Sequence, residues 1–85
     1  MAATVHLGGD AEKLARALRA IAAASADRRL RGTAARCAAR VRRSMDRREV
    51  QRVVWLLRTA RRDTSLPRAE HRAAAYWSAR LGGRT

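Results

Sequence analysis

The chain has 85 residues, enough for one small domain, and half of its 40 hydrophobic residues are alanines, so any core that it buries is thin. Twenty basic residues, 19 of them arginines, stand against seven acidic ones and give a net charge of +13, which attracts polyanions. The single cysteine, Cys37, excludes an internal disulfide and a cysteine-based zinc site, and no apolar run is long enough to span a membrane.

The first residues, 1–9, are predicted to form an irregular N-terminal arm, extended around Thr4 to Leu7 and broken at Gly8 and Gly9. They lack the basic start and the apolar centre of a secretory signal, which predicts a cytoplasmic protein. The abundance of arginine and alanine is typical of a GC-rich coding sequence and favours a bacterial source.

Apolar residues spaced by three and four predict helices over about 10–25, 28–44, 46–62 and 66–81. The first helix is predicted to be capped by Asp10. Its buried stripe is Leu14, Leu18 and Ile21. A break near Ser25 keeps the apolar stripes of the first two helices in phase.

The second helix is predicted to begin at Asp27, with Leu30, Ala34 and Cys37 on its buried face. The third helix has the clearest start in the chain, because Asp46 can cap it and Glu49 can complete a capping box.

The third helix also holds the one run of large apolar residues in the chain, Val53 to Leu57. Trp55 lies within this run, so we predict that its indole packs in the core. Stacking of Trp55 on a nucleic-acid base is the alternative.

A turn over residues 63–67 precedes the fourth helix, with Ser65 as its predicted cap and Pro67 in its first turn. The residues predicted to face inward are Leu66, Ala69, Ala73, Trp77 and Leu81. Gly82 is predicted to end this helix, and residues 83–85 to fray.

These elements predict an all-α fold of four short helices, arranged as two antiparallel helical hairpins in a small bundle. Residues 10–82 are predicted to form a single helical domain. Sliding the chain by 36 residues aligns Asp10 with Asp46 and Asp27 with Asp63, which suggests a weak internal repeat.

All seven acidic residues lie at or near a predicted helix start, where they complement the helix dipole. That placement leaves no pair of carboxylates for acid–base catalysis. His6 and His71 have no nucleophile–acid pattern around them and are interpreted as surface residues, and Cys37 as a small core residue. We therefore predict no enzymatic activity, no metal site and no cofactor.

The basic residues fall on helix faces that suit phosphate groups, since arginine donates two hydrogen bonds from one planar fork. The candidate nucleic-acid-binding residues on the second helix form a stripe about opposite Leu30: Arg29, Arg36, Arg40 and Arg43. Those on the third helix share an edge with Trp55: Arg48, Arg52, Arg58 and Arg62. Those on the fourth helix are Arg72, Tyr76 and Arg80. The alternative interpretation of each stripe is an ordinary solvated helix face.

The first hypothesis from the sequence is a nucleic-acid-binding protein that contacts phosphates and has little or no base readout, with DNA and RNA both open as targets. A helix-turn-helix made by the third and fourth helices is less favoured, because the fourth helix offers few base-reading side chains. The second hypothesis is a protein-interaction module that pairs with an acidic protein or with itself. A membrane partner is not expected, because the apolar face of the second helix is mostly alanine.

Overall fold

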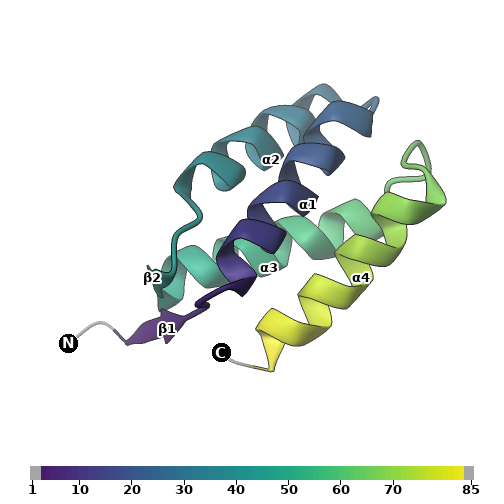
Figure 1. The fold of residues 1–85 in the computed structure, drawn as a ribbon. Coiled ribbons are helices and arrows are strands. Elements are labelled where there is room, and N and C mark those ends of the chain that lie inside the picture. The colour runs from purple at the N-terminus through teal and green to yellow at the C-terminus, as the bar shows by residue number, and fades with distance from the viewer. Residues whose placement is uncertain (1–2, 84–85) are drawn as a thin grey trace.

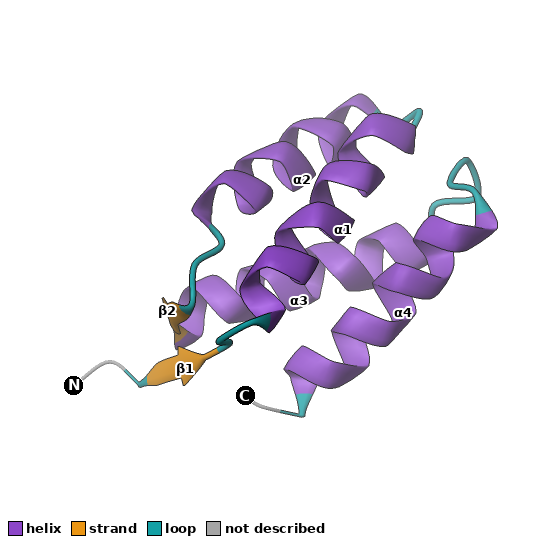
Figure 2. Ribbon diagram, in the orientation of Figure 1, coloured by secondary structure: helices purple, strands orange, loops and turns teal. Residues whose placement is uncertain are grey.

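The computed structural model describes residues 3–83, which form four helices and two short strands in the order β1, α1, α2, β2, α3, α4 (Figure 1). Their bounds are Thr4–His6 (β1), Asp10–Ala24 (α1), Arg28–Arg40 (α2), Ser44–Asp46 (β2), Arg47–Arg61 (α3) and Arg68–Gly82 (α4). The strands form a small patch beside a body made of helices (Figure 2). The predictions for residues 1–2 of the arm and 84–85 of the C-terminus fall outside the described residues.

The helices form two hairpins. α1 packs along α2, and α3 packs along α4. The hairpins meet where α1 lies against α4 and where α2 lies against α3, and the resulting body measures 38 × 20 × 19 Å. No helix within residues 3–83 is long and apolar enough to cross a membrane.

The core takes side chains from every helix and from both strands. Its large side chains with no exposed surface are Leu18, Ile21, Leu57 and Leu81. Ala34, Ala60 and Ala74 are equally buried, with exposed fractions of 0%. Because a methyl group fills little space, neighbouring helices can approach closely at these alanines, and the area buried per residue stays modest.

The prediction of a purely all-α fold is wrong, because β1 and β2 pair as an antiparallel two-stranded sheet. Val5 pairs with Met45 at the centre of the sheet, and both side chains are buried. The flanking residues Thr4, His6 and Ser44 are exposed. The arm predicted to be irregular therefore contains a strand, whose one inward side chain covers the end of the core.

The second helix is shorter than predicted, since α2 ends at Arg40 and the sequence suggested residue 44. Val41 has extended backbone angles, φ −66° and ψ 131°, and starts a linker to β2. The Leu7 N–H donates to the Arg43 carbonyl at 2.6 Å, which fastens this linker beside β1. The end of the segment that periodicity alone assigned to the helix, residues 41–44, therefore leads into β2 and pairs with β1.

α2 and α3 are capped by the residues that the sequence predicted, Asp27 and Asp46. Asp27 accepts the Arg29 N–H at 3.0 Å, as a capping residue does. The capping box predicted at α3 is confirmed: Asp46 caps the helix, and the Asp46 N–H donates to Glu49 Oε1 at 3.2 Å. α1 differs, because Asp10 is its first residue and Gly9 occupies the N-cap position.

The fourth helix begins at Arg68, after Pro67 as its N-cap residue, and so starts later than the predicted residue 66. Ser65 does not cap it. The Ser65 hydroxyl instead donates to Asp63 Oδ1 at 2.6 Å and accepts the Ala26 N–H at 3.1 Å. The turn before α4 is therefore fastened to the turn after α1.

The order of elements repeats, since each half of the described chain runs strand, helix, helix. The spacing between the halves is not constant. α3 begins 37 residues after α1, and α4 begins 40 residues after α2. The helix starts therefore do not keep a uniform 36-residue spacing, although buried residues at that spacing do correspond, as Leu18 with Val54 and Ile21 with Leu57.

Candidate nucleic-acid interface

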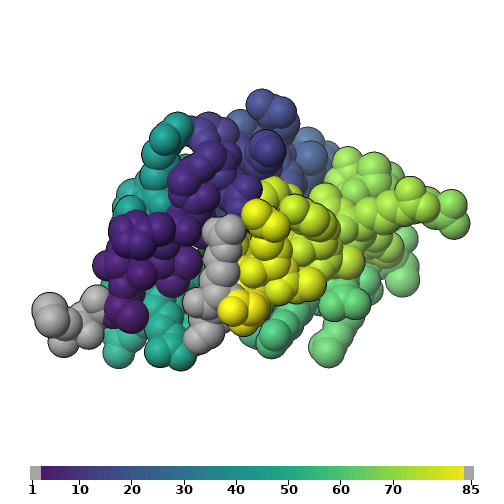
Figure 3. All heavy atoms as spheres, turned by 60° about the horizontal axis from the view of Figure 1, so that its bottom comes forward, coloured from purple at the N-terminus to yellow at the C-terminus, as the bar shows by residue number. Residues whose placement is uncertain are grey.

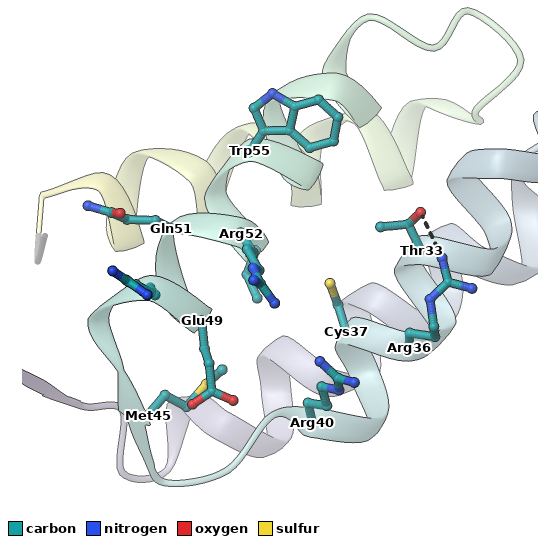
Figure 4. Close-up of a pocket in the computed structure, with 11 residues that line it drawn as sticks. Thr33, Arg36, Cys37, Arg40, Met45, Glu49, Gln51, Arg52 and Trp55 are labelled. Atoms are coloured by element: carbon teal, nitrogen blue, oxygen red, sulfur yellow. Dashed lines mark hydrogen bonds between the residues drawn. The ribbon is translucent and has the colours of Figure 1, made fainter. Parts of the chain in front are cut away.

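A groove of about 630 Å³ runs between α2 and α3 (Figure 4). Its α2 wall is Thr33, Arg36, Cys37 and Arg40. Its α3 wall is Arg48, Gln51, Arg52 and Trp55. The four arginines from these two walls, Arg36, Arg40, Arg48 and Arg52, are called the groove arginines below. All four are residues that the sequence singled out for phosphate binding, and the fold brings them to one site.

The α3 wall follows from the phase of the helix. Val50, Val53 and Leu57 lie on its buried face, with exposed fractions of 2% or less. Trp55 is five residues past Val50, about 140° around the helix axis at 100° per residue, so it points away from the core. Arg52, three residues before Trp55, lies about 60° from it around the same axis. The backbone that buries the valines therefore also presents an aromatic ring and a cation together.

The prediction that Trp55 packs in the core is wrong, because 65% of its surface is exposed. The apolar run Val53 to Leu57 suggested burial, but a helix turns each successive residue by about 100° and a run of five cannot share one face. Helical phase was the signal in the sequence that could have placed Trp55 correctly. Figure 4 shows its indole at one end of the groove.

The α2 wall presents the half-buried Cys37 thiol between Arg36 and Arg40. Leu30, Ala34 and Ala38 hold this helix to the core. Arg36 and Arg40 flank that buried stripe and share the groove with Cys37, so their stripe is not opposite Leu30 as the sequence suggested. Figure 4 shows the Cys37 sulfur directed toward the α3 wall.

The one carboxylate in the groove is already held by other groups. Glu49 pairs with Arg42 through two hydrogen bonds, of 2.6 and 3.1 Å, and also accepts the Asp46 N–H. The hydrogen bond from Arg42, followed by that from the Asp46 N–H, lowers the pKa of Glu49 below its ordinary value of 4.5. Within residues 3–83 none of the groove arginines forms an ion pair, so their charge faces solvent.

The charge of the groove arginines affects the pKa of the Cys37 thiol. Burial raises the pKa of Cys37 above its ordinary value of 9.0, and the nearby guanidinium groups act in the opposite direction. Those groups are Arg36, Arg40 and Arg52. Three of the four groove arginines are thus close enough to act on one atom inside the groove, which makes its interior electropositive.

Seven predicted residues do not line the groove: Arg29, Arg43, Arg58, Arg62, Arg72, Tyr76 and Arg80. Two of them are held by carboxylates. Arg43 forms an ion pair with Glu12 at 3.3 Å, and Arg80 forms one with Asp10 at 2.9 Å. Figure 3 shows the C-terminal end of α4 beside the start of α1, where the second of these pairs forms. The structure therefore divides the predicted set into groove residues and residues elsewhere on the surface.

The sequence missed Thr33, Gln51 and Met45 as groove residues. Thr33 accepts a hydrogen bond of 3.4 Å from Arg36, and Met45 comes from β2, which was not predicted. The arginine stripes of α2 and α3 line the same groove because the two helices pack together. No local pattern in the sequence could have predicted this packing.

The histidines lie apart from the groove. His6 Nδ1 is 3.0 Å from the Ser44 hydroxyl in the two-stranded sheet, and His71 Nε2 bonds to the Asp63 carbonyl. Among the residues that the structure describes, no group of three or more histidine, cysteine and acidic side chains is placed to hold a metal ion. Comparisons with protein-family models, curated proteins and solved structures found no match for this chain.

Proposed function

We propose that this chain is a bacterial cytoplasmic protein that binds nucleic acid through its phosphates, in the groove between α2 and α3. The observation that carries the proposal is the set of four groove arginines, which line one groove from two helices and form no ion pair within residues 3–83. The net charge of +13 adds a long-range attraction for any polyanion.

Phosphate contacts explain this composition better than base readout does. A guanidinium group donates two parallel hydrogen bonds to phosphate oxygens, and each neutralised phosphate releases condensed counterions. Asparagine, which pairs with adenine through two hydrogen bonds, is absent from the sequence, and the one glutamine, Gln51, lies in the groove among the arginines. We therefore expect affinity that depends strongly on salt and weakly on base sequence.

The proposal is tested with a double variant, Arg36→Ala with Arg40→Ala, which removes two charges from the α2 wall. Its matched control is Arg16→Ala with Arg19→Ala, which removes two exposed charges from α1. Fluorescence anisotropy with labelled DNA and RNA strands, titrated at several salt concentrations, measures binding. We expect the groove variant to lose roughly tenfold more affinity than the control, and its salt slope to fall by about 0.7 to 0.9 per lost phosphate contact.

Two outcomes would contradict the proposal. If wild type binds neither DNA nor RNA at low salt, the chain is not a nucleic-acid-binding protein. If both double variants weaken binding equally, the net charge and not the groove determines affinity. Both variants change exposed side chains, so thermal unfolding should show that they fold as wild type does.

A second candidate function is protein interaction, and the exposure of two aromatic residues favours it. Trp55 is 65% exposed and Tyr76 is 55% exposed. Tryptophan, tyrosine and arginine are the residues enriched at interface hot spots. Light scattering at physiological salt separates the two functions: a stable dimer that added polyanion leaves unchanged supports protein interaction, and a monomer that binds oligonucleotides supports the first proposal.

A further inference from the structure

Trp55 differs from the other two aromatic residues of the chain in having a free ring face. Trp77 is buried, with 6% of its surface exposed. Tyr76 meets the Trp77 ring edge-on, with centroids 5.1 Å apart, and carries the Arg80 guanidinium 5.9 Å from its centroid. Within residues 3–83 the Trp55 ring makes neither a ring–ring contact nor a cation–π contact.

The position of Trp55 matters as much as its exposure. Its ring lies at one end of the groove, and Arg52, one helical turn earlier on α3, points into the groove (Figure 4). A phosphate held by Arg52 would leave an adjoining base near the indole. Grooves that bind single-stranded nucleic acid without base readout combine these two features, cations along the backbone path and an aromatic ring for a base.

We infer that the groove takes a single strand of nucleic acid, with an unpaired base stacked on Trp55 and the flanking phosphates held by the groove arginines. The inference rests on the proposed function and names its substrate. It explains why a large aromatic side chain stands in solvent at the end of a cationic groove, where an exposed indole otherwise loses hydrophobic stabilisation.

A duplex fits this site poorly for two reasons. Its bases are stacked on one another, so none offers a free face to Trp55. Its phosphates also lie on a convex surface, and proteins that read it insert a helix or ribbon into a major groove about 12 Å wide. Here the groove arginines line the groove from two walls, α2 and α3, which suits a narrow strand lying between them.

The size of the groove agrees with a short length of strand. Pockets of roughly 300–1,000 Å³ enclose ligands of drug size, which is about the size of one or two nucleotides. The groove volume of about 630 Å³ falls within that range. The rest of a longer strand would extend over the neighbouring surface of α2 and α3.

The test uses the full chain and three probes of about 12 nucleotides: an oligo-dT strand, an abasic strand with the same phosphates and no bases, and a duplex. The variants are Trp55→Ala, which removes the ring, and Trp55→Phe, which keeps an aromatic face. Tryptophan fluorescence gives a second readout, because wild type reports on Trp55 and Trp77 together and Trp55→Phe reports on Trp77 alone.

We expect oligo-dT to bind more tightly than either the abasic strand or the duplex. Trp55→Ala should lose on the order of tenfold in affinity for oligo-dT and change little for the abasic strand, while Trp55→Phe keeps most of the affinity. Oligo-dT should quench the fluorescence of wild type and leave that of Trp55→Phe nearly constant. Because Trp55 is exposed, Trp55→Ala should keep the thermal midpoint of wild type.

The contrary outcomes are distinct. Equal affinity for strand and duplex, or no loss for Trp55→Ala on oligo-dT, overturns the single-strand inference and leaves the proposed function standing. An equal loss for Trp55→Ala on the abasic strand overturns it too, because the ring would then act without a base. Failure of all three probes, and of an RNA strand of the same length, to bind at low salt overturns the proposed function, and this inference with it.

Discussion

The Ser25 hydroxyl donates a hydrogen bond of 2.6 Å to Asp63 Oδ2 and thereby joins the turn between α1 and α2 to the turn between α3 and α4. Ser25 is 4% exposed, and its oxygen also accepts the Asp27 N–H at 3.0 Å. The turns of the two hairpins lie side by side, and the Ser25–Asp63 hydrogen bond joins them. One buried hydroxyl therefore links the hairpins at the end of the bundle opposite the sheet.

Replacing Ser25 with alanine should destabilise the fold. The substitution removes a hydroxyl that donates to a carboxylate and leaves the Asp27 N–H without its partner, which costs about 1–2 kcal/mol. Urea unfolding followed by circular dichroism measures the change. Thr64→Ala, an exposed position in the neighbouring turn, is the control and should stay within about 0.5 kcal/mol of wild type. Equal stability of the two variants would show that the hydrogen bond contributes nothing to the fold.

Stability should fall in acid because Asp63 is more acidic in the folded chain. Hydrogen bonds from Ser25 and then Ser65 lower the pKa of Asp63 below its ordinary value of 3.8. A carboxyl whose folded pKa is lowered stabilises the fold fully above its unfolded pKa, and this contribution disappears as the pH falls through the folded pKa.

Urea midpoints measured from about pH 6 down to about pH 2 should therefore fall most steeply below about pH 4. Asp63→Asn keeps an oxygen acceptor but loses the titrating group, so its curve should be shallower in that range. A variant curve parallel to that of wild type would assign the acid dependence to other carboxyls, of which Glu49 is one, since its pKa is also lowered.

Salt should stabilise the free protein. The net charge of +13 makes the folded chain repel itself, and dissolved ions screen charges over about 8–10 Å at physiological ionic strength. We expect the thermal midpoint to rise by roughly 4–8 °C between low and moderate salt, which corresponds to about 1 kcal/mol in a domain of this size. Arg16→Ala with Arg19→Ala should show a smaller rise. A midpoint that falls with salt would mean that ion pairs such as Arg80–Asp10 outweigh the repulsion.

Cys37 offers a chemical probe of the groove. Because burial raises its pKa above 9.0, little thiolate is present at neutral pH, and a thiol reagent should modify it more slowly than free cysteine. A bound oligonucleotide should slow the reaction further, since Cys37 lies between Arg36 and Arg40 on the groove wall. An unchanged rate in the presence of saturating oligonucleotide would place the binding surface elsewhere.

The elements that the sequence predicted well are those set by local chemistry. α1 and α3 match their predicted bounds to within one residue. Their apolar spacing is helical, and Asp46 with Glu49 marks the start of α3 within four residues of chain. Arg36 and Arg52 were likewise found as members of arginine stripes, because a stripe is a property of one helix.

The features that the sequence missed depend on partners far along the chain. The strand at Val5 has only three residues, too few for their alternation of exposed and buried side chains to predict a sheet, and it forms because Met45 lies across from it. Ser65 was taken for a helix cap, but its hydroxyl is used by Asp63 and by the Ala26 N–H. The meeting of the α2 and α3 arginines in one groove needs the same kind of long-range information.

The two-stranded sheet also bears on the order in which the chain folds. Bringing Val5 to Met45 closes a loop of 40 residues for only three residue pairs, so the entropy lost is large relative to the stabilisation that so short a sheet provides. The hairpins close much shorter loops and bury their stripes with near neighbours, which favours them as early folding events. We therefore expect β1 and β2 to pair after the transition state for folding. Val5→Ala should then accelerate unfolding and leave the refolding rate almost unchanged.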